Sequence, residues 1–202
     1  MSDTSGSAPV LSPEPPRDVL AARARAEEIV SAEAVQFAID QTAVRLTVAL
    51  NDANPVLLCV LHGGLAYTGE LLKRLPFPLE LSYVHVGRYG DATRGQGLTW
   101  FARPTLELAR RHVLLIDDIF DQGKTLSALV AWSFAQGAAA VTTTVLVDKL
   151  LKSQRGEAIS IDYAALRCRD RYLFGCGMDY RGYWRNLPAI YALPRDMENQ
   201  HA

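Results

Sequence analysis

Three carboxylates stand within five positions of one another, directly after a short apolar run. The run covers residues 113–116, and Asp117, Asp118 and Asp121 follow it. Four apolar residues are too few for a helix and are typical of a buried parallel strand, which would stop at these carboxylates. Carboxylates this close repel one another when they are buried, so they need hydroxyl donors or a cation. A sugar phosphate with Mg²⁺ would supply both.

The residues that follow predict a phosphate site. Apolar positions recur at helical spacing after Thr125 up to an expected stop at Gly137, so a helix follows the strand and its acidic loop. The free backbone N–H groups of a helix's first turn and the positive end of its dipole attract phosphate. Gly123 lets the chain approach the anion, and the Thr125 hydroxyl adds a donor.

A strand with an acidic loop also occurs in other settings. A solvated acidic turn in an ordinary α/β protein would show the same pattern. Gly123-Lys124-Thr125 is also half of the phosphate-binding loop of nucleoside triphosphatases, which requires a second glycine five positions before Gly123. Asp118 stands at that position. The spacing therefore argues against a triphosphatase, whereas the acidic turn stays open.

Residues 113–125 as a whole resemble the signature of type I phosphoribosyltransferases. That signature is an apolar strand followed by two acids, two apolar residues, Asp, a small residue, Gly, any residue and Thr. The resemblance implies that Asp117 and Asp118 hold the ribose hydroxyls and that Asp121, the catalytic residue, takes the purine's proton. It assigns the 5′-phosphate to the loop that begins at Asp121. The other loop residues are Gln122, Gly123, Lys124 and Thr125.

A second strand, residues 56–61, runs directly into His62-Gly63-Gly64 and a helix expected over residues 65–75. A glycine pair at such a place is commonly only a tight turn, although it also points backbone amides at an anion. In the 6-oxopurine members of the family the matching loop, typically Leu-Lys-Gly-Gly, binds pyrophosphate. The resemblance gives that role to His62, Gly63 and Gly64. His62 stands where Lys is usual, so the charge of the loop depends on pH.

Residues 87–97 hold four glycines among polar residues, which predicts a mobile loop. Long loops of this kind are either disordered or functional lids. A lid would keep water from an oxocarbenium-like ribosyl centre. The family has a lid at this point with a Ser-Tyr-Gly core, so the resemblance makes Arg88 and Tyr89 substrate contacts.

Lys149 follows a β-branched strand expected over residues 140–147. A lysine at a strand end is ordinarily a solvated charge. Residues 171–180, further along the chain, have an ordinary interpretation too: a glycine-broken strand whose aromatic side chains fill the core. The resemblance instead makes Lys149 a donor to the purine O6, which favours hypoxanthine and guanine over adenine. It implies that Tyr172 stacks on the base and that the backbone at Leu173 reads its edge.

The family resemblance also implies a Mg²⁺ ion near the leaving pyrophosphate. It assigns the metal to Asp179 together with Asp117 and Asp118. Arg185, five residues after Tyr180, fits the arginine of the family that contacts pyrophosphate.

Composition points to small-molecule partners in a reducing compartment. The 202 residues are 49% hydrophobic and hold 21 basic against 22 acidic residues, which argues against a nucleic-acid-binding surface. Cys59, Cys168 and Cys176 are odd in number and lie in no metal-ligand spacing, which favours reduced thiols. No transmembrane run and no export signal stand out, so we expect no membrane partner and a cytoplasmic protein.

The expected fold is α/β: the type I phosphoribosyltransferase fold, a mainly parallel sheet flanked by helices with a small hood subdomain built from both chain ends. Residues 1–17 are rich in Ser, Pro and Gly and predict a disordered tail, and residues 18–202 form one domain. A helix capped at Ser31 and closed by a turn at 51–55 precedes the first buried strand. Further strands are expected over residues 79–86, 162–166 and 189–193.

The resemblance runs from about residue 31 to residue 193. It implies a purine salvage enzyme that transfers the 5-phosphoribosyl group from phosphoribosyl pyrophosphate to N9 of hypoxanthine or guanine, and a homo-oligomer, dimer or tetramer. A sister enzyme for xanthine or a pyrimidine, and a non-catalytic sensor of phosphoribosyl pyrophosphate, stay open. Lys149 and Tyr172 favour a 6-oxopurine, and the presence of Asp121 favours an enzyme over a sensor.

Overall fold

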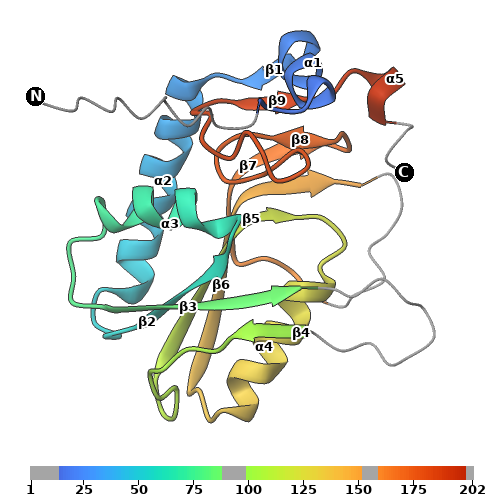
Figure 1. Cartoon of the computed structure of the whole chain (residues 1–202). Coiled ribbons are helices and arrows are strands. Elements are labelled where there is room, and N and C mark those ends of the chain that lie inside the picture. The colour runs from blue at the N-terminus through green and yellow to red at the C-terminus, as the bar shows by residue number, and fades with distance from the viewer. Residues whose placement is uncertain (1–13, 88–98, 152–158, 199–202) are drawn as a thin grey trace, which may run out of the picture.

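The computed structural model describes residues 14–87, 99–151 and 159–198. A six-stranded sheet with strand order β4-β3-β2-β5-β6-β7 lies at its centre (Figure 1). The elements in chain order are α1 (Arg17–Arg25), β1 (Glu27–Val30), α2 (Ala32–Leu50), β2 (Val56–Leu61), α3 (Gly64–Leu72), β3 (Glu80–Gly87), β4 (Thr99–Ala102), β5 (His112–Phe120), α4 (Lys124–Ala135), β6 (Ala140–Leu150), β7 (Tyr163–Arg169), β8 (Leu173–Phe174), β9 (Ile190–Ala192) and α5 (Arg195–Glu198).

The sheet is parallel except at one edge. β2 pairs with β3 and β5, β5 with β6, and β6 with β7, all in parallel, whereas β4 runs antiparallel to β3. The carboxyl ends of the parallel strands therefore share one edge. In folds of this kind ligands bind outside that edge.

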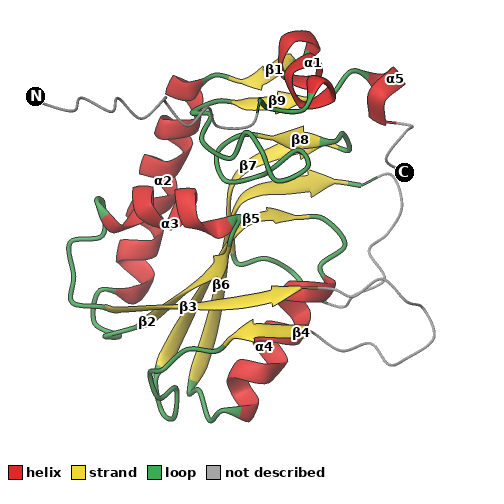
Figure 2. Ribbon diagram, in the orientation of Figure 1, coloured by secondary structure: helices red, strands yellow, loops and turns green. Residues whose placement is uncertain are grey.

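Helices cover both faces of the sheet (Figure 2). α2 and α3 pack on the face that carries Leu57, Leu114 and Leu146, and α4 packs on the face that carries Leu58 and Leu115. Strands buried on both faces are continuous apolar runs, which is why β2 and the first half of β5 are recognisable in the sequence.

A separate three-stranded antiparallel sheet, β1-β9-β8, forms the hood. Its own apolar cluster includes Val19 of α1, Phe174 of β8, Tyr191 of β9 and Met197 of α5. The hood therefore joins the two ends of the described chain, and the mainly parallel sheet with helices on both sides matches the expected fold class.

The predicted helix starts are confirmed at α2 and α4. The hydroxyl of Ser31 accepts a hydrogen bond from the N–H of Ala34 at 3.3 Å, so Ser31 caps α2. Gly123 turns the chain from β5 into α4. Its φ of +77° lies in the region that favours glycine.

Several predicted ends are wrong. β5 does not stop at the carboxylates but continues through Asp117 and Asp118 to Phe120, because its ladder with β6 continues as Ile119 opposite Val147 and Phe120 opposite Asp148. β6 likewise runs on to Leu150 along β7. α3 ends at Leu72, three residues before its predicted end. Strand pairing between distant segments, which local apolar patterns do not report, decides the ends of β5 and β6.

Two sequence predictions lie outside the described residues. They are the main part of the N-terminal tail, residues 1–13, and the glycine-rich loop with Arg88 and Tyr89, which falls in residues 88–98. Helix α1 begins at Arg17, the residue at which the tail was expected to end.

Candidate active site

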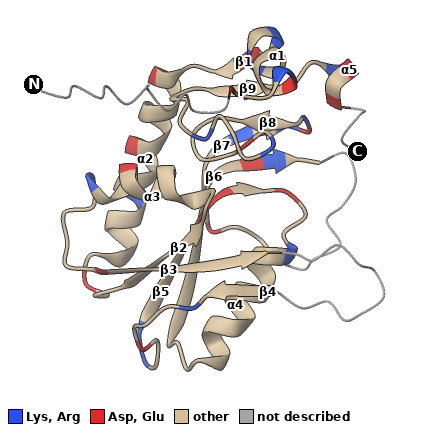
Figure 3. Cartoon of the chain, viewed as in Figure 1, with Lys and Arg blue, Asp and Glu red and all other residues tan. Residues whose placement is uncertain are grey.

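The two adjacent carboxylates of β5 lie at the edge of a cavity of about 290 Å³. The cavity is lined by residues 117–123 together with Thr125 and Leu126, so it lies between the carboxyl end of β5 and the start of α4. One carboxylate oxygen of Asp117 accepts from the backbone N–H of Asp118 at 2.9 Å, and one of Asp118 accepts from Ile119 at 2.8 Å. Figure 3 shows the acidic positions gathered along this end of the strand.

Crowding and burial make this pair of carboxylates hard to ionise. Burial raises the pKa of Asp117 well above its ordinary value, and the negative charge of Asp118 raises it further. Burial also raises the pKa of Asp118, although its hydrogen bonds and the positive charge of Arg185 work in the opposite direction. Hydroxyl donors or a cation would relieve this cost, which is the chemistry of a ribose site.

We expect Asp117→Asn to stabilise the ligand-free protein. Because the folded-state pKa of Asp117 is raised, the folded state binds more protons than the unfolded state, and stability falls as pH rises from about 4 through the folded-state pKa. Asparagine removes this loss while keeping the oxygen that accepts from Asp118. The free energy of unfolding at neutral pH should rise by about 0.5–2 kcal/mol.

Urea unfolding across pH tests this expectation. The gain of Asp117→Asn over wild type should shrink as the pH approaches about 4. Asp52→Asn, which removes an exposed carboxylate from the turn after α2, is the matched control. Parallel stability curves for wild type and Asp117→Asn would show that Asp117 does not strain the fold.

The start of α4 has the features of a helix N-terminus that can bind an anion. α4 is 12 residues long, has no side-chain cap and carries no acidic residue in its first turn. Gly123 also has no room for a side chain, because a Cβ there would lie 2.8 Å from the ring of Phe120. The phosphate loop predicted from Asp121 to Thr125 thus lines the same cavity as the ribose carboxylates.

The predicted pyrophosphate loop meets this site from β2. A Cβ on Gly63 would lie 1.9 Å from a carboxylate oxygen of Asp118, and a Cβ on Gly64 would lie 2.6 Å from the carbonyl oxygen of Ile116. Both glycines are therefore required by close packing against β5. The peptide bond between Leu61 and His62 is cis.

The His62 ring packs edge to face on the ring of His85 in β3, with centroids 4.4 Å apart. Phe101 of β4 lies behind His85, at 4.8 Å between centroids. Burial lowers the pKa of His85, and the positive charge of His62 lowers it further. Sequence reasoning did not identify His85 as a neighbour, because β3 reaches the loop only through sheet pairing.

Lys149 and Asp121 come together across the edge of β5 and β6. The Lys149 ammonium lies 3.3 Å from a carboxylate oxygen of Asp121 and 3.1 Å from one of Asp170. The Lys149 side chain is only 13% exposed, whereas that of Asp121 is 45% exposed. Asp170 was missed by the sequence analysis, since it follows β7 and no spacing links it to Lys149.

Tyr172 and Leu173 lie at the start of the hood. The Tyr172 hydroxyl donates to the backbone oxygen of Asp179 at 3.2 Å, and its ring packs edge to face on Tyr180 with centroids 5.9 Å apart. Leu173 is buried and its backbone pairs with Ala192 of β9.

Asp179 and Arg185 form an ion pair of 2.6 Å. Asp179 also accepts from the N–H of Gly182 at 2.6 Å, and Arg185 donates to the carbonyl of Gly177 at 2.6 Å. A Cβ on Gly177 would lie 2.0 Å from the carbonyl oxygen of Gly63, so this loop lies directly on the pyrophosphate loop. The fold also brings the positive charge of Arg185 within electrostatic reach of Asp118, far away in sequence, where it lowers the pKa of that carboxyl.

Asp117 and Asp118 offer adjacent carboxylates, the ligand type and number that Mg²⁺ commonly takes from a protein. Within the described residues, no three carboxylate, imidazole or thiol side chains converge as a metal cluster. Mg²⁺ is commonly held by one or two carboxylates, with substrate phosphates and water completing its octahedron. The crowded, hard-to-ionise pair Asp117 and Asp118 is suited to such partial coordination.

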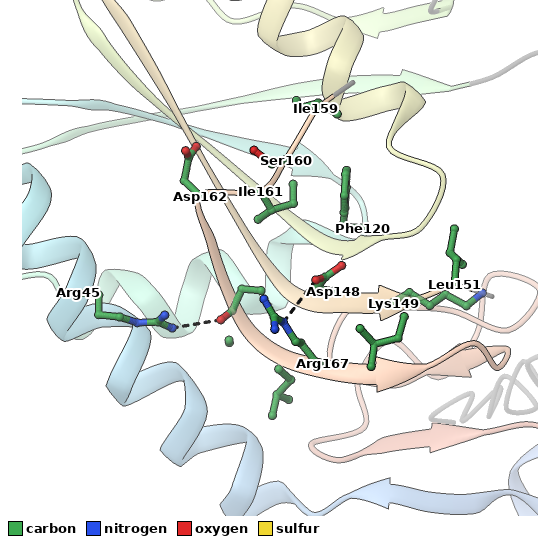
Figure 4. Close-up of a pocket in the computed structure, with 14 residues that line it drawn as sticks. Arg45, Phe120, Asp148, Lys149, Leu151, Ile159, Ser160, Ile161, Asp162 and Arg167 are labelled. Carbon is green, nitrogen blue, oxygen red and sulfur yellow. Dashed lines mark hydrogen bonds and ion pairs between the residues drawn. The ribbon is translucent and has the colours of Figure 1, made fainter. Parts of the chain in front are cut away.

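A larger cavity of about 970 Å³ lies beside this site (Figure 4). It shares Phe120 and Lys149 with the site. The rest of its lining comes from the end of β6, the residues before β7, β7 itself and Arg45 of α2. Arg167 of β7 pairs with Asp148 of β6 at 3.6 Å, and Arg45 donates to the Ala164 carbonyl at 3.1 Å. Asp117 and Asp118 do not line it. Its size alone therefore does not make it the reaction site.

A parallel-sheet edge, paired carboxylates and a helix start meet in one cavity, as expected for a phosphoribosyltransferase. Residues 25–181 match the family model of the phosphoribosyl transferase domain. The chain belongs to the phosphoribosyltransferase family, and its fold is the type I fold of that family.

Individual relatives narrow the class. The chain is 33% identical over 156 residues to the hypoxanthine-guanine-xanthine phosphoribosyltransferase of Tritrichomonas foetus, an alignment that covers 77% of this chain and 85% of that protein. It is 31% identical over 166 residues to the hypoxanthine-guanine phosphoribosyltransferase of Bacillus subtilis (strain 168), covering 82% and 91%. A solved structure of a hypoxanthine-guanine-xanthine phosphoribosyltransferase superposes with a TM-score of 0.76 at 30% identity, covering 84% of this chain and 97% of that one.

Proposed function

We propose that this chain is a purine salvage enzyme that transfers the 5-phosphoribosyl group from phosphoribosyl pyrophosphate to N9 of hypoxanthine or guanine, giving IMP or GMP and pyrophosphate. The pairing of Lys149 with Asp121 carries the proposal. In a 6-oxopurine, O6 and N7 lie side by side on one edge of the base. A largely shielded ammonium 3.3 Å from a carboxylate matches that edge, with Lys149 donating to O6 and Asp121 accepting the proton from N7.

Phosphoribosyl pyrophosphate spans three parts of the site in this proposal: two loops that bind its phosphates and, between them, the carboxylates that bind its ribose. Its 5′-phosphate binds the loop formed by Asp121, Gln122, Gly123, Lys124 and Thr125. Its ribose hydroxyls donate to Asp117 and Asp118. Its pyrophosphate binds at residues 62–64 and to Arg185, whose guanidinium already lies near Asp118. Close packing of Gly63 and Gly177 supports one continuous surface for these groups.

The base binds between β6 and the hood. Tyr172 stacks on the purine and the backbone at Leu173 reads its edge, while Asp121 removes the N7 proton as N9 forms the bond to C1. Arg88 and Tyr89 complete the substrate contacts in this proposal. Their segment is outside the described residues.

Asp179, Asp117 and Asp118 would hold the Mg²⁺ ion. When bound, Mg²⁺ supplies positive charge to the departing pyrophosphate. The ion pair of Asp179 with Arg185 keeps both residues at the pyrophosphate end of the site.

We further propose a cytoplasmic homo-oligomer, dimer or tetramer, with residues 1–17 as a tail outside a single domain. None of the helices in residues 14–87, 99–151 and 159–198 has both the length and the apolarity that a membrane span requires.

An assay of the purified protein with phosphoribosyl pyrophosphate, Mg²⁺ and each base in turn tests the proposed function. Hypoxanthine or guanine should be converted to its nucleotide. Xanthine is included because the name of the Tritrichomonas foetus relative contains it. Binding of phosphoribosyl pyrophosphate with turnover of no base would contradict the proposal and identify a sensor.

We expect His62→Lys to lower the KM for phosphoribosyl pyrophosphate, because a lysine keeps its positive charge to above pH ~10 and residue 62 belongs to the loop assigned to pyrophosphate. The KM for hypoxanthine, measured on the same two proteins, is the internal control. An equal KM for phosphoribosyl pyrophosphate in wild type and His62→Lys would exclude the side-chain charge from pyrophosphate binding.

A further inference from the structure

The N-terminal helix α1 is an integral part of the hood. Val19 and Ala22 on one face of α1 are 1% and 0% exposed and pack in the apolar cluster with Phe174 and Tyr180. Arg23 lies over the ring of Tyr191 at 4.2 Å from its centroid. Figure 1 shows α1 beside β1 and β9, at the side of the hood away from the six-stranded sheet.

Two polar contacts tie α1 to the loop between Asp179 and Arg185. The indole N–H of Trp184 donates to the backbone oxygen of Val19 at 2.9 Å. The carboxylate of Asp18 forms an ion pair with Arg181. Both contacts are made by loop residues that lie between the two members of the Asp179–Arg185 ion pair.

The backbone of this loop needs such support. Arg181, Gly182 and Trp184 have φ values of +53°, +87° and +69°. Residues other than glycine adopt this region rarely, and they keep it where surrounding contacts hold them there. The bond from Trp184 to Val19 is a contact of that kind, since it holds the side chain of a residue with positive φ.

The other side of the loop meets the site. Arg185 pairs with Asp179 and donates to the carbonyl of Gly177, and the N–H of Gly177 donates back to the Arg185 carbonyl at 2.9 Å. Gly177 in turn lies against the backbone of Gly63. A shift of the loop at Trp184 would therefore reach both Arg185 and the pyrophosphate loop.

We propose that α1 is a positioning element for the pyrophosphate end of the active site, and that Trp184, through its bond to Val19, is a positioning residue for Arg185 and Asp179. The family match begins at residue 25, so all of α1 before its last residue precedes the matched domain. The identity of the ligand as pyrophosphate rests on the proposed function.

Trp184→Phe tests the proposal, because phenylalanine keeps an aromatic ring on α1 and loses the N–H donor. The Kd of inorganic pyrophosphate in the presence of Mg²⁺, measured by calorimetry on the full chain, should rise about 3- to 10-fold, as for the loss of one net hydrogen bond. The KM for hypoxanthine should stay near the wild-type value. Asp196→Asn is the matched control, since it breaks the 2.7 Å ion pair of Arg25 with Asp196 in the same hood without touching the loop.

An unchanged Kd for pyrophosphate in Trp184→Phe, with a lowered Tm, would overturn the proposal, because Trp184 would then serve the fold alone. An equal rise in Asp196→Asn would overturn it as well. If Trp184→Phe does not fold, Asp18→Asn is measured instead; a rise in Kd supports the positioning role and no change overturns it. Failure of the proposed function is seen separately, as wild-type protein that binds pyrophosphate and converts no base.

Discussion

Replacing Asp121 with asparagine is expected to lower kcat with hypoxanthine by about 10²–10⁴-fold, the usual contribution of a general base. The amide keeps the shape and the hydrogen-bonding oxygen of the carboxylate and loses its capacity to take up a proton. Binding of phosphoribosyl pyrophosphate should be nearly intact, because the 5′-phosphate is held by the backbone at the start of α4. Steady-state kinetics with both substrates separate the two effects.

The control for Asp121→Asn is Asp170→Asn. Both variants remove one carboxylate from Lys149, which lies 3.3 Å from Asp121 and 3.1 Å from Asp170. Only the first removes the proposed base. Asp170→Asn should therefore lower kcat far less than Asp121→Asn. Equal losses in the two variants would assign the effect to the ion pairs of Lys149, and an unchanged kcat in Asp121→Asn would remove Asp121 from the chemistry.

Lys149→Ala is expected to raise the KM for hypoxanthine and guanine by about 10- to 150-fold, which corresponds to the 1.5–3 kcal/mol of a hydrogen bond from a charged group. The KM for phosphoribosyl pyrophosphate should change little, since the donor faces the base. The preference for 6-oxopurines over adenine should narrow as well, because the site loses the donor that matches O6.

Lys73→Ala is the control for Lys149→Ala. Lys73 lies in the turn directly after α3 and forms an exposed ion pair with Glu70 at 2.7 Å, so its removal tests the loss of a lysine without touching the site. If the two KM values of Lys149→Ala rose together, Lys149 would act on the fold or on the phosphates. In that case the purine edge would have to be read by other groups.

Much of the candidate site was predictable because its residues are contiguous. Asp117, Asp118 and the loop from Asp121 to Thr125 all belong to or follow one apolar strand, and the glycine pair follows another. Strand, turn and helix start are local structures whose signals are apolar runs, glycine and the periodicity of the next helix. The structure places both segments at the same edge of a parallel sheet, as the sequence analysis expected.

Prediction was weaker wherever the partner lies far away in the chain. The extension of β5 to Phe120 depends on pairing with β6, and the second carboxylate on Lys149 comes from Asp170, beyond β7. The contact of His62 with His85 arises because β3 is the neighbour of β2 in the sheet. α1 was not predicted, because it is short and depends on tertiary contacts with the rest of the hood.

The order of residues makes the carboxylates, glycines and cations of this protein available, and it marks which of them start a helix or lie near the end of a strand. How these groups are combined depends on the packing of distant segments. It set Lys149 beside Asp121, Arg185 near Asp118, and α1 against Trp184. The physical reason is that a local pattern records the preference of a few neighbouring residues, whereas a contact between distant segments depends on how the whole chain buries its apolar faces and satisfies its polar groups.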